Sequence, residues 1–239
     1  MSESLIYTHN PEQLSLDIGL RDDFDFQGYY PGDNQQLFSA LKTIHHGEGF
    51  QYLYWWGTKG SGKTHLLQGV CHAWAAHGLQ TIYLRGEEIK YFDVEMLQGL
   101  DDLDLVCIDD VDALAGLNHW EEAIFHLYNR LQLNHKTLLI TSQQAPKDLP
   151  LLLADLTSRL CSGLIYQIHE LSDEDKGAVL KIRAKRRGFE LADEVVAFLF
   201  SRSQRDMASL IHVLNRIDTY SLAEQRKVTI PFVKEVMGW

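Results

Sequence analysis

One stretch of the sequence has the residue types and spacing of a phosphate-binding loop. Residues 57–64 read Gly-Thr-Lys-Gly-Ser-Gly-Lys-Thr and match the pattern G-x-x-x-x-G-K-[ST] at every fixed position. In such a loop the glycines let backbone N–H groups turn toward phosphate oxygens, and the following helix adds its free N–H groups and its dipole. Lys63 is predicted to reach the β- and γ-phosphates, and Thr64 to ligate Mg²⁺. We therefore expect the chain to bind a nucleoside di- or triphosphate.

A second part of the predicted site is the acidic pair Asp109 and Asp110, which ends the apolar run at 105–108. Together with a phosphate loop, such an acid holds Mg²⁺, usually through water, and a second acid can orient the attacking water. We assign these roles to Asp109, with Thr64, and to Asp110. An acidic turn that caps a helix is the alternative. The predicted phosphate contacts are Gly57, Thr58, Lys59, Gly60, Ser61, Gly62, Lys63, Thr64 and His65.

Three further polar features follow these acids along the chain. The apolar run at 136–142 ends in Thr141 and Ser142, followed by Gln143, and Arg159 comes just before the next strand candidate. Arg205 opens the third helix predicted for the C-terminal part. A single arginine is more often a surface ion-pair partner than a phosphate sensor. The order of these residues along the chain nevertheless suits a nucleotide site.

The elements that must position these residues alternate between strands and helices. Apolar residues recur at helical spacing from Leu66 to Trp74, and Gly78 is a natural helix stop. Four of the five strand candidates are mostly apolar, which is typical of a parallel sheet covered on both faces. The strand candidates are 51–56, 80–85, 104–109, 136–142 and 164–168.

From residue 172 onward the pattern is helical only. Ser172-Asp173-Glu174-Asp175 is typical of a capping box, and Gly188 is expected to end the helix that it starts. A second helix is predicted near 192–203 and a third along the apolar stripe at 207–217. Pro231 is expected to open a last short helix.

The chain of 239 residues is therefore expected to comprise a flexible tail at 1–20, an α/β nucleotide-binding domain at 21–170 and a small helical domain at 171–239. Because the chain has a net charge of −11, we do not expect binding of a nucleic-acid backbone to be its main function. No apolar run approaches the roughly 20 residues that cross a bilayer, and the N-terminus lacks the features of a secretory signal. We expect a cytoplasmic protein.

The cysteines and histidines give no sign of a metal centre. Cys71, Cys107 and Cys161 are far apart in the sequence, and each lies in an apolar or helical pattern. We predict three buried thiols in a reducing compartment. The eleven histidines form no metal-binding motif, and none is assigned as a ligand.

The series of phosphate loop, paired aspartates, polar strand end and two arginines resembles the AAA+ ATPases, and within them the family of the bacterial replication initiator DnaA. The likeness covers about residues 24–239. It is carried by Tyr-Pro-Gly-Asp-Asn at 30–34, Ile-Asp-Asp-Val at 108–111, Glu-Ala-Ile-Phe-His-Leu-Tyr-Asn-Arg at 122–130 and Leu-Ile-Thr-Ser at 139–142. The resemblance implies an AAA+ domain with a parallel five-stranded sheet, a helical lid, and ADP or ATP with Mg²⁺.

The sequence departs from the pattern of the initiator in two places. Gln143 stands where the initiator more usually has an acid. Because the sequence ends at Trp239, we expect no basic helix-turn-helix domain and no direct DNA binding.

The predicted tail contains a second short resemblance. In an extended chain Leu14, Leu16 and Ile18 would project to one side, with Gln13 able to hydrogen-bond at the rim of a pocket. The segment resembles the peptide with which bacterial proteins dock on the DNA polymerase sliding clamp. Asp17 replaces the proline often found there. A stray edge strand is the alternative interpretation.

Together the two resemblances imply a negative regulator of replication initiation. It would dock on the sliding clamp and present Arg159, as an arginine finger in trans, to ATP held by DnaA. Its own nucleotide, which the family likeness suggests is ADP, would fix the angle between domain and lid, with Lys63 on phosphate and Arg205 closing from the lid. AAA+ domains commonly pair, so a homodimer or homo-oligomer is a further expectation.

Two other functions remain open from the sequence. An autonomous AAA+ ATPase of the helicase-loader type would use Asp110 to position water and would turn over ATP itself. A small-molecule kinase would need a substrate lid inside the α/β domain, and no arginine-rich insert is found there. We expect at most weak intrinsic ATPase activity.

Overall fold

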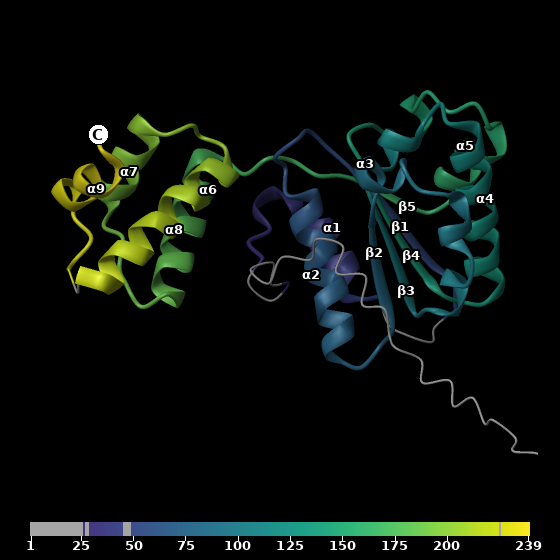
Figure 1. Cartoon of the computed structure of the whole chain (residues 1–239), viewed down its shortest axis with the longest axis horizontal. Coiled ribbons are helices and arrows are strands. Elements are labelled where there is room, and N and C mark those ends of the chain that lie inside the picture. The colour runs from purple at the N-terminus through teal and green to yellow at the C-terminus, as the bar shows by residue number, and fades with distance from the viewer. Residues whose placement is uncertain (1–25, 27–28, 45–48, 225) are drawn as a thin grey trace, which may run out of the picture.

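The computed structural model describes residues 26, 29–44, 49–224 and 226–239, and it consists of an α/β part followed by a helical part (Figure 1). The tail peptide with Gln13, Leu14, Leu16 and Ile18 lies outside the described residues. None of the helices in the described ranges is long and apolar enough to cross a membrane.

The α/β part is built on a five-stranded parallel sheet, as predicted. Its strand order is β2-β3-β4-β1-β5, so β1 lies between β4 and β5, and every pairing is parallel. Each strand agrees with its sequence prediction to within one residue at either end. The strands are β1 (Gln51–Trp56), β2 (Thr81–Arg85), β3 (Leu105–Asp109), β4 (Thr137–Ser142) and β5 (Leu164–Gln167).

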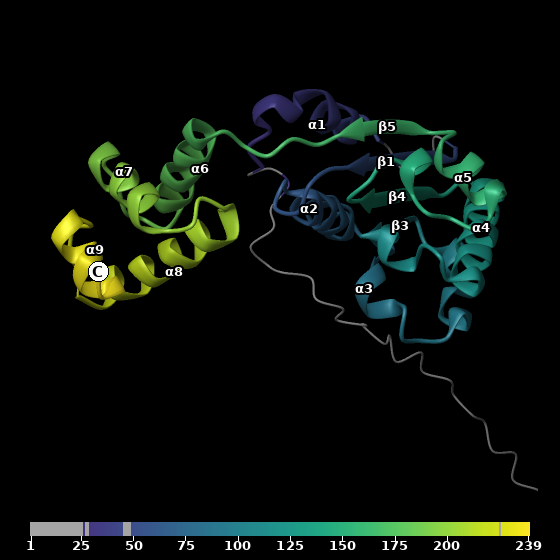
Figure 2. The same cartoon turned by 90° about the horizontal axis from the view of Figure 1, so that it is seen from above.

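Helices cover both faces of this sheet (Figure 2). Alternate residues of a strand point to opposite faces, so Leu53 and Trp55 pack with α1 and α2, whereas Tyr52 and Tyr54 pack with α4 and α5. The helices are α1 (Gln35–Lys42), α2 (Lys63–Ala76), α3 (Gly86–Ile89), α4 (Asn118–Leu133) and α5 (Ala154–Leu160). Short 3₁₀ turns occupy Gly32–Asn34, Val94–Leu97, Leu100–Asp102, Val111–Leu114 and Pro146–Asp148.

The helical part has its own apolar core. Its helices are α6 (Asp173–Arg186), α7 (Asp193–Arg202), α8 (Met207–Glu224) and α9 (Ile230–Met237). The predicted capping box at the start of α6 is confirmed, because the Asp175 N–H donates to the Ser172 hydroxyl and the Ser172 N–H donates back to the Asp175 carboxylate. Leu180, Leu199 and Leu214 are fully buried in this core. It is separate from the two apolar cores that lie on the two faces of the sheet.

The segment that joins β5 to α6 is tied to the start of the described chain and to the phosphate loop. The buried Asn34 amide donates to the His169 carbonyl (2.9 Å) and accepts from the His169 N–H (2.7 Å). The Thr58 hydroxyl donates to the Glu170 carboxylate at 2.9 Å. Tyr30 hydrogen-bonds to Asp175 in the first turn of α6.

The surface of the α/β part includes an edge strand, β5, and one exposed cysteine, Cys161. Within the described sheet β5 pairs with β1 alone, and Leu164 and Ile165 of this edge strand are exposed. Cys71 and Cys107 are buried as predicted, but the prediction of a third buried thiol was wrong. Cys161 is exposed because it caps the C-terminus of α5, at the surface.

Candidate nucleotide-binding site

The phosphate loop connects the end of β1 to the start of α2. Gly60 and Gly62 have φ values of +90° and +96°, in the left-handed region that favours glycine. Gly57 is needed for a different reason, since a Cβ there would lie 2.3 Å from the Ile168 carbonyl oxygen. The loop thus bends back on itself, and α2 begins at Lys63 with its free N–H groups at the loop.

The polar groups of this loop fit a phosphate ligand. Lys63 is only 5% exposed. Its ammonium donates to the carbonyls of Gly57 (2.9 Å) and Thr58 (3.1 Å). Both hydrogen-bond partners are neutral carbonyls, and the ammonium also attracts the Asp110 carboxylate, whose charged form it favours. The Ser61 hydroxyl is buried and has no hydrogen-bond partner among the described residues. A buried cation and an orphaned hydroxyl beside a helix N-terminus are groups that phosphate oxygens satisfy.

The buried carboxylate of Asp109, at the C-terminal end of β3, accepts hydrogen bonds from three hydroxyl groups. Its Oδ2 atom accepts from Thr64 and from Tyr83, each at 2.7 Å, and its Oδ1 atom accepts from Thr141. Burial raises the pKa of Tyr83, which keeps its phenol a donor. Thr64 and Asp109, the two residues expected to hold Mg²⁺, therefore lie in direct contact. No group of three His, Cys, Asp or Glu side chains forms a metal cage in the described ranges, so such an ion would need water and phosphate oxygens as well.

Asp110 is held in an uncommon backbone conformation at the same edge. Its φ and ψ are 50° and 54°, a left-handed geometry that residues other than glycine seldom adopt. Its N–H donates to the Thr141 hydroxyl at 3.0 Å, and a Cβ at Gly86 would lie 2.3 Å from its carbonyl oxygen. Burial, and then the charge of Asp109, raise the pKa of Asp110 to about 6. Asp110 thus keeps its proton to a higher pH than an ordinary aspartate does.

The predicted polar end of β4 serves two different purposes. Thr141 contacts both aspartates, as described above. The Ser142 hydroxyl and the Gln143 N–H both donate to the Asp112 carboxylate at 3.0 Å, while the Gln143 side chain is exposed. Asp112 thus fixes the backbone of the strand end.

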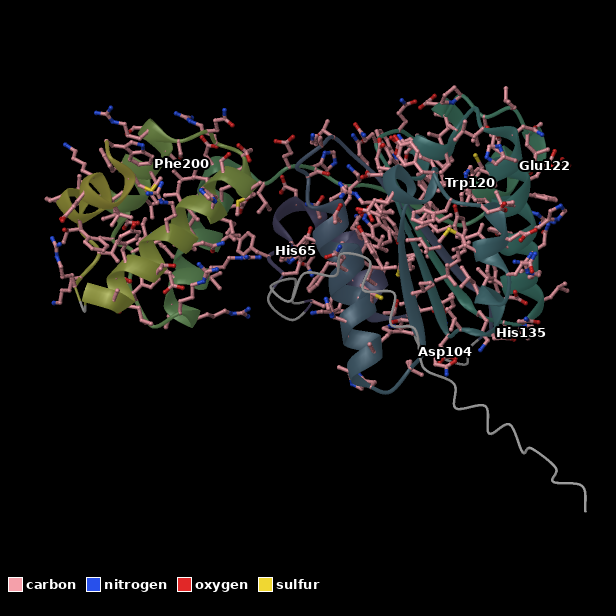
Figure 3. All side chains as sticks on the ribbon, viewed as in Figure 1. His65, Asp104, Trp120, Glu122, His135 and Phe200 are labelled. Carbon is pink, nitrogen blue, oxygen red and sulfur yellow. The ribbon has the colours of Figure 1, made fainter. Side chains whose placement is uncertain are left out.

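An aromatic residue that the phosphate-loop pattern does not include lies against the loop. The Tyr29 ring centroid is 5.7 Å from that of His65, in the first turn of α2, and a Cβ at Gly62 would be 3.8 Å from the Tyr29 hydroxyl. Figure 3 labels His65 on this part of α2. Burial raises the pKa of Tyr29 to about 12. Tyr29 and His65 together flank the N-terminus of α2.

Arg159 lies away from this loop. Its helix α5 packs with α4 on one face of the sheet, whereas α2 packs on the other (Figure 2). The end of α5 lies beside the start of β1, because the Tyr52 hydroxyl donates to the Leu160 carbonyl at 3.0 Å. A strand rise of about 3.3 Å per residue separates the Cα atoms of Tyr52 and Gly57 by roughly 16 Å. The structure therefore does not bring Arg159 to the chain's own phosphate loop.

Arg205 lies two residues before α8 and its side chain is 63% exposed. It donates to the carboxylate of Asp173, in the first turn of α6, at 2.8 Å. This places Arg205 at the end of α6 nearest the joining segment, in an exposed ion pair. Its predicted contact with nucleotide stays a prediction.

The fold and the loop together define a P-loop protein of the AAA+ class with a helical lid. The family model for the bacterial DnaA ATPase domain matches residues 20–167, and the chain belongs to this family. A second family model, described as the lid domain of Hda, matches residues 173–237.

Solved structures show the same fold. Domain III of the replication initiation protein DnaA from Thermotoga maritima is 22% identical, with a TM-score of 0.73 over 92% of this chain and 97% of that one. DnaA from Aquifex aeolicus, bound to AMPPCP, is 24% identical with a TM-score of 0.70, over 87% of this chain and 69% of that one. The RuvB Holliday junction branch migration motor of Thermotoga maritima is 18% identical with a TM-score of 0.61, over 85% and 67%.

Proposed function

We propose that this chain is a nucleotide-bound negative regulator of DNA replication initiation that makes the initiator DnaA hydrolyse its ATP. Membership of the DnaA ATPase family and the Hda-type lid support this proposal. One observation carries it. Arg159 is remote from the chain's own phosphate loop, and no carboxylate pairs with it among the residues described. An arginine so placed is suited to act on a nucleotide held by another molecule.

In this proposal the positively charged guanidinium of Arg159 lies against the phosphates of ATP held by DnaA. A guanidinium stabilises the negative charge that spreads over the transferred phosphoryl group, and in other phosphoryl-transfer systems an arginine supplied in trans accelerates the reaction about 10³–10⁵-fold. Conversion of DnaA to its ADP form would then suppress further initiation.

The chain's own nucleotide is proposed to be an adenine nucleotide with Mg²⁺, since a DnaA relative is solved with AMPPCP. The loop from Gly57 to Thr64, with Lys63 on phosphate, would hold it. When bound, Mg²⁺ would neutralise phosphate charge next to Thr64 and Asp109. The nucleotide's task is then to set the lid, because Thr58 of the loop is bonded to Glu170 of the segment that leads into the lid.

The sliding clamp is proposed as the platform for this reaction. Gln13, Leu14, Leu16 and Ile18 form the proposed docking peptide, which lies outside the described residues. Replacing Gln13 and Leu16 by Ala is expected to abolish stimulation that depends on the clamp while leaving nucleotide binding intact.

The deciding experiment measures ATP hydrolysis by purified DnaA with this protein added, with and without clamp loaded on DNA. Stimulation that needs the clamp and is lost in Arg159→Ala is the expected result. Arg202→Ala is the matched control, because Arg202 also lies over an aromatic ring, that of Phe198 at 5.9 Å, but in the lid. Full stimulation by Arg159→Ala would overturn the proposed mechanism.

An autonomous ATPase is the second candidate, and the pKa of about 6 for Asp110 favours it. A carboxylate with a pKa near the working pH is a suitable general base for water. Turnover of ATP by this chain alone, lost in Asp110→Asn, would support this function in place of the first.

A further inference from the structure

One face of α4 holds the helix that carries Arg159. Glu121, Phe125 and Tyr128 are spaced i, i+4 and i+7 and therefore share a face of α4. The Glu121 carboxylate is fully buried and accepts the N–H groups of Leu152 and Leu153, each at 2.8 Å. Since Leu153 is the N-cap residue of α5, Glu121 fixes where this helix begins.

The other end of α5 is fixed by Tyr128. The Ser162 hydroxyl donates to the Arg159 carbonyl at 2.7 Å and lies 2.9 Å from the Tyr128 hydroxyl. A serine hydroxyl has one proton. Because that proton goes to Arg159, Tyr128 must be the donor to Ser162. A hydrogen-bond chain therefore runs from Tyr128 through Ser162 to the backbone of Arg159.

The same tyrosine supports the Arg159 side chain. The guanidinium carbon lies 5.7 Å from the ring centroid of Tyr128 and 6.0 Å from that of Phe125. Among the residues that the structure describes, the guanidinium contacts these two rings and forms no ion pair. A long arginine side chain loses much conformational freedom when it acts, and a ring that already restricts it reduces that loss.

We propose that Tyr128 is a positioning residue for Arg159. Its hydroxyl fixes the backbone of Arg159 through Ser162, and its ring, beside that of Phe125, supports the guanidinium without neutralising it. The inference rests on the proposed function only in assigning Arg159 to a nucleotide in trans. The ordering of Arg159 is a property of this chain by itself.

The first test observes Arg159 in the isolated full chain. The Nε–H signal of Arg159 is assigned by its loss in Arg159→Lys, and ¹⁵N relaxation then measures its order. We expect Tyr128→Leu, which removes hydroxyl and ring, to lower the order parameter of this signal clearly, and Tyr128→Phe and Ser162→Ala to lower it by less. Tyr220→Phe, at an exposed tyrosine of the lid, is the matched control. An unchanged Arg159 signal in all three variants would overturn the proposal.

The second test measures DnaA ATP hydrolysis against the concentration of each variant. A positioning residue changes the maximal stimulation, so Tyr128→Phe and Ser162→Ala should lower it about three- to tenfold with the half-maximal concentration unchanged. A raised half-maximal concentration with full maximal stimulation would mean that Tyr128 only shapes a docking surface, and would overturn the proposal. Should Tyr128→Leu fail to fold, the two conservative variants decide.

Failure of the proposed function gives a different pattern. If Arg159→Ala stimulates DnaA as well as the unchanged protein, the trans role of Arg159 is wrong, while the relaxation data still decide whether Tyr128 orders it. If Arg159→Ala loses stimulation but the Tyr128 and Ser162 variants keep both stimulation and Arg159 order, only the positioning role is wrong.

Discussion

At the scale of single residues, the nucleotide site combines a buried cation with a carboxylate whose charge is disfavoured. Lys63 is buried against two backbone carbonyls, and Asp110 has a left-handed backbone beside the buried Asp109. Neither arrangement is favourable for the fold by itself. Both would become favourable with phosphate and Mg²⁺ bound, as proposed, because opposite charges would then compensate each other.

Replacing Asp110 by Asn is expected to stabilise the nucleotide-free protein in a pH-dependent manner. The folded-state pKa of about 6 lies above the ordinary value of 3.8, so the native state binds the proton more tightly than the unfolded state does. The wild-type carboxylate therefore lowers stability above pH 6, and this loss disappears as the pH falls toward 4. Asn keeps the shape and tolerates the left-handed backbone.

Urea unfolding at pH 8, 6 and 5 measures this effect. We expect Asp110→Asn to be more stable at pH 8 by on the order of 1–2 kcal/mol, with a smaller difference at pH 5. The same difference at all three pH values would show that the change acts through backbone strain and not through the charge.

Replacing Lys63 by Met is expected to weaken binding of a fluorescent ADP analogue about 10–100-fold, the usual range for losing a charge-assisted hydrogen bond to phosphate. Met keeps the length of the side chain and fits its buried site. Titration monitored by fluorescence anisotropy measures the affinity. Lys185→Met is the matched control, because Lys185 is an exposed lysine of α6, outside the loop, and equal losses in both variants would contradict the assignment.

The sequence predicted the residues whose spacing along the chain is diagnostic, and missed those placed by the sheet. The phosphate loop and the paired aspartates were predicted because each is a local pattern. Tyr83 reaches Asp109 only because β2 pairs with β3 in a register that sets Arg85 beside Asp109. Gly86 was likewise invisible, since its close approach to Asp110 spans two strands.

At the scale of elements, the helix pair α4 and α5 forms a rigid unit on one face of the sheet. Glu121 is central to it, since its carboxylate also accepts the Gly116 N–H at 2.7 Å, in addition to the two N–H groups before α5. A carboxylate with three N–H donors is well satisfied when ionised. The unit therefore depends on a charge that is buried but fully hydrogen-bonded.

Replacing Glu121 by Gln is expected to lower the free energy of unfolding by about 2 kcal/mol, because an amide NH₂ group would face a backbone N–H donor. Glu122→Gln is the matched control, since Glu122 is the exposed neighbour on α4 and accepts a hydrogen bond from the Asn118 side chain (Figure 3). Urea midpoints at pH 7 compare the two variants. A loss in Glu122→Gln as large as that in Glu121→Gln would refute the role of the buried carboxylate.

Elements were predicted from sequence better than their arrangement was. The strands were found to within one residue because long apolar runs mark them, and α6 because its capping box does. The contact between α4 and α5 had no local signal: Glu121 meets backbone groups 31 and 32 residues later in the chain. The two rings beneath Arg159 were missed for the same reason.

At the scale of the whole molecule, one short segment connects the nucleotide-binding part to the lid. It is held by Asn34 at His169, by Thr58 at Glu170 and by Tyr30 at the first turn of α6. The phosphate loop and the lid thus share a common support, and we expect a change at the loop to reach the lid through these hydrogen bonds.

Replacing Asn34 by Ala is expected to loosen the lid. The change removes the side chain that hydrogen-bonds to the N–H and C=O of His169, at a cost of about 1–3 kcal/mol. Spin labels on the exposed Cys161 and on Leu222→Cys in α8 report the separation of the two parts. We expect a broader distance distribution in Asn34→Ala, and an unchanged one in the control Asn118→Ala. Equal distributions in both would mean that other contacts hold the lid.

The unpaired edge of β5 has a consequence for how the protein aggregates when it is heated. A strand that pairs on one side only, with Leu164 and Ile165 exposed, presents backbone groups on which the strand of another molecule can form. Warming should therefore lead to precipitation instead of reversible melting, and apparent melting temperatures should depend on heating rate and protein concentration. A lysine in place of Ile165 is a simple way to keep heated or stored samples clear.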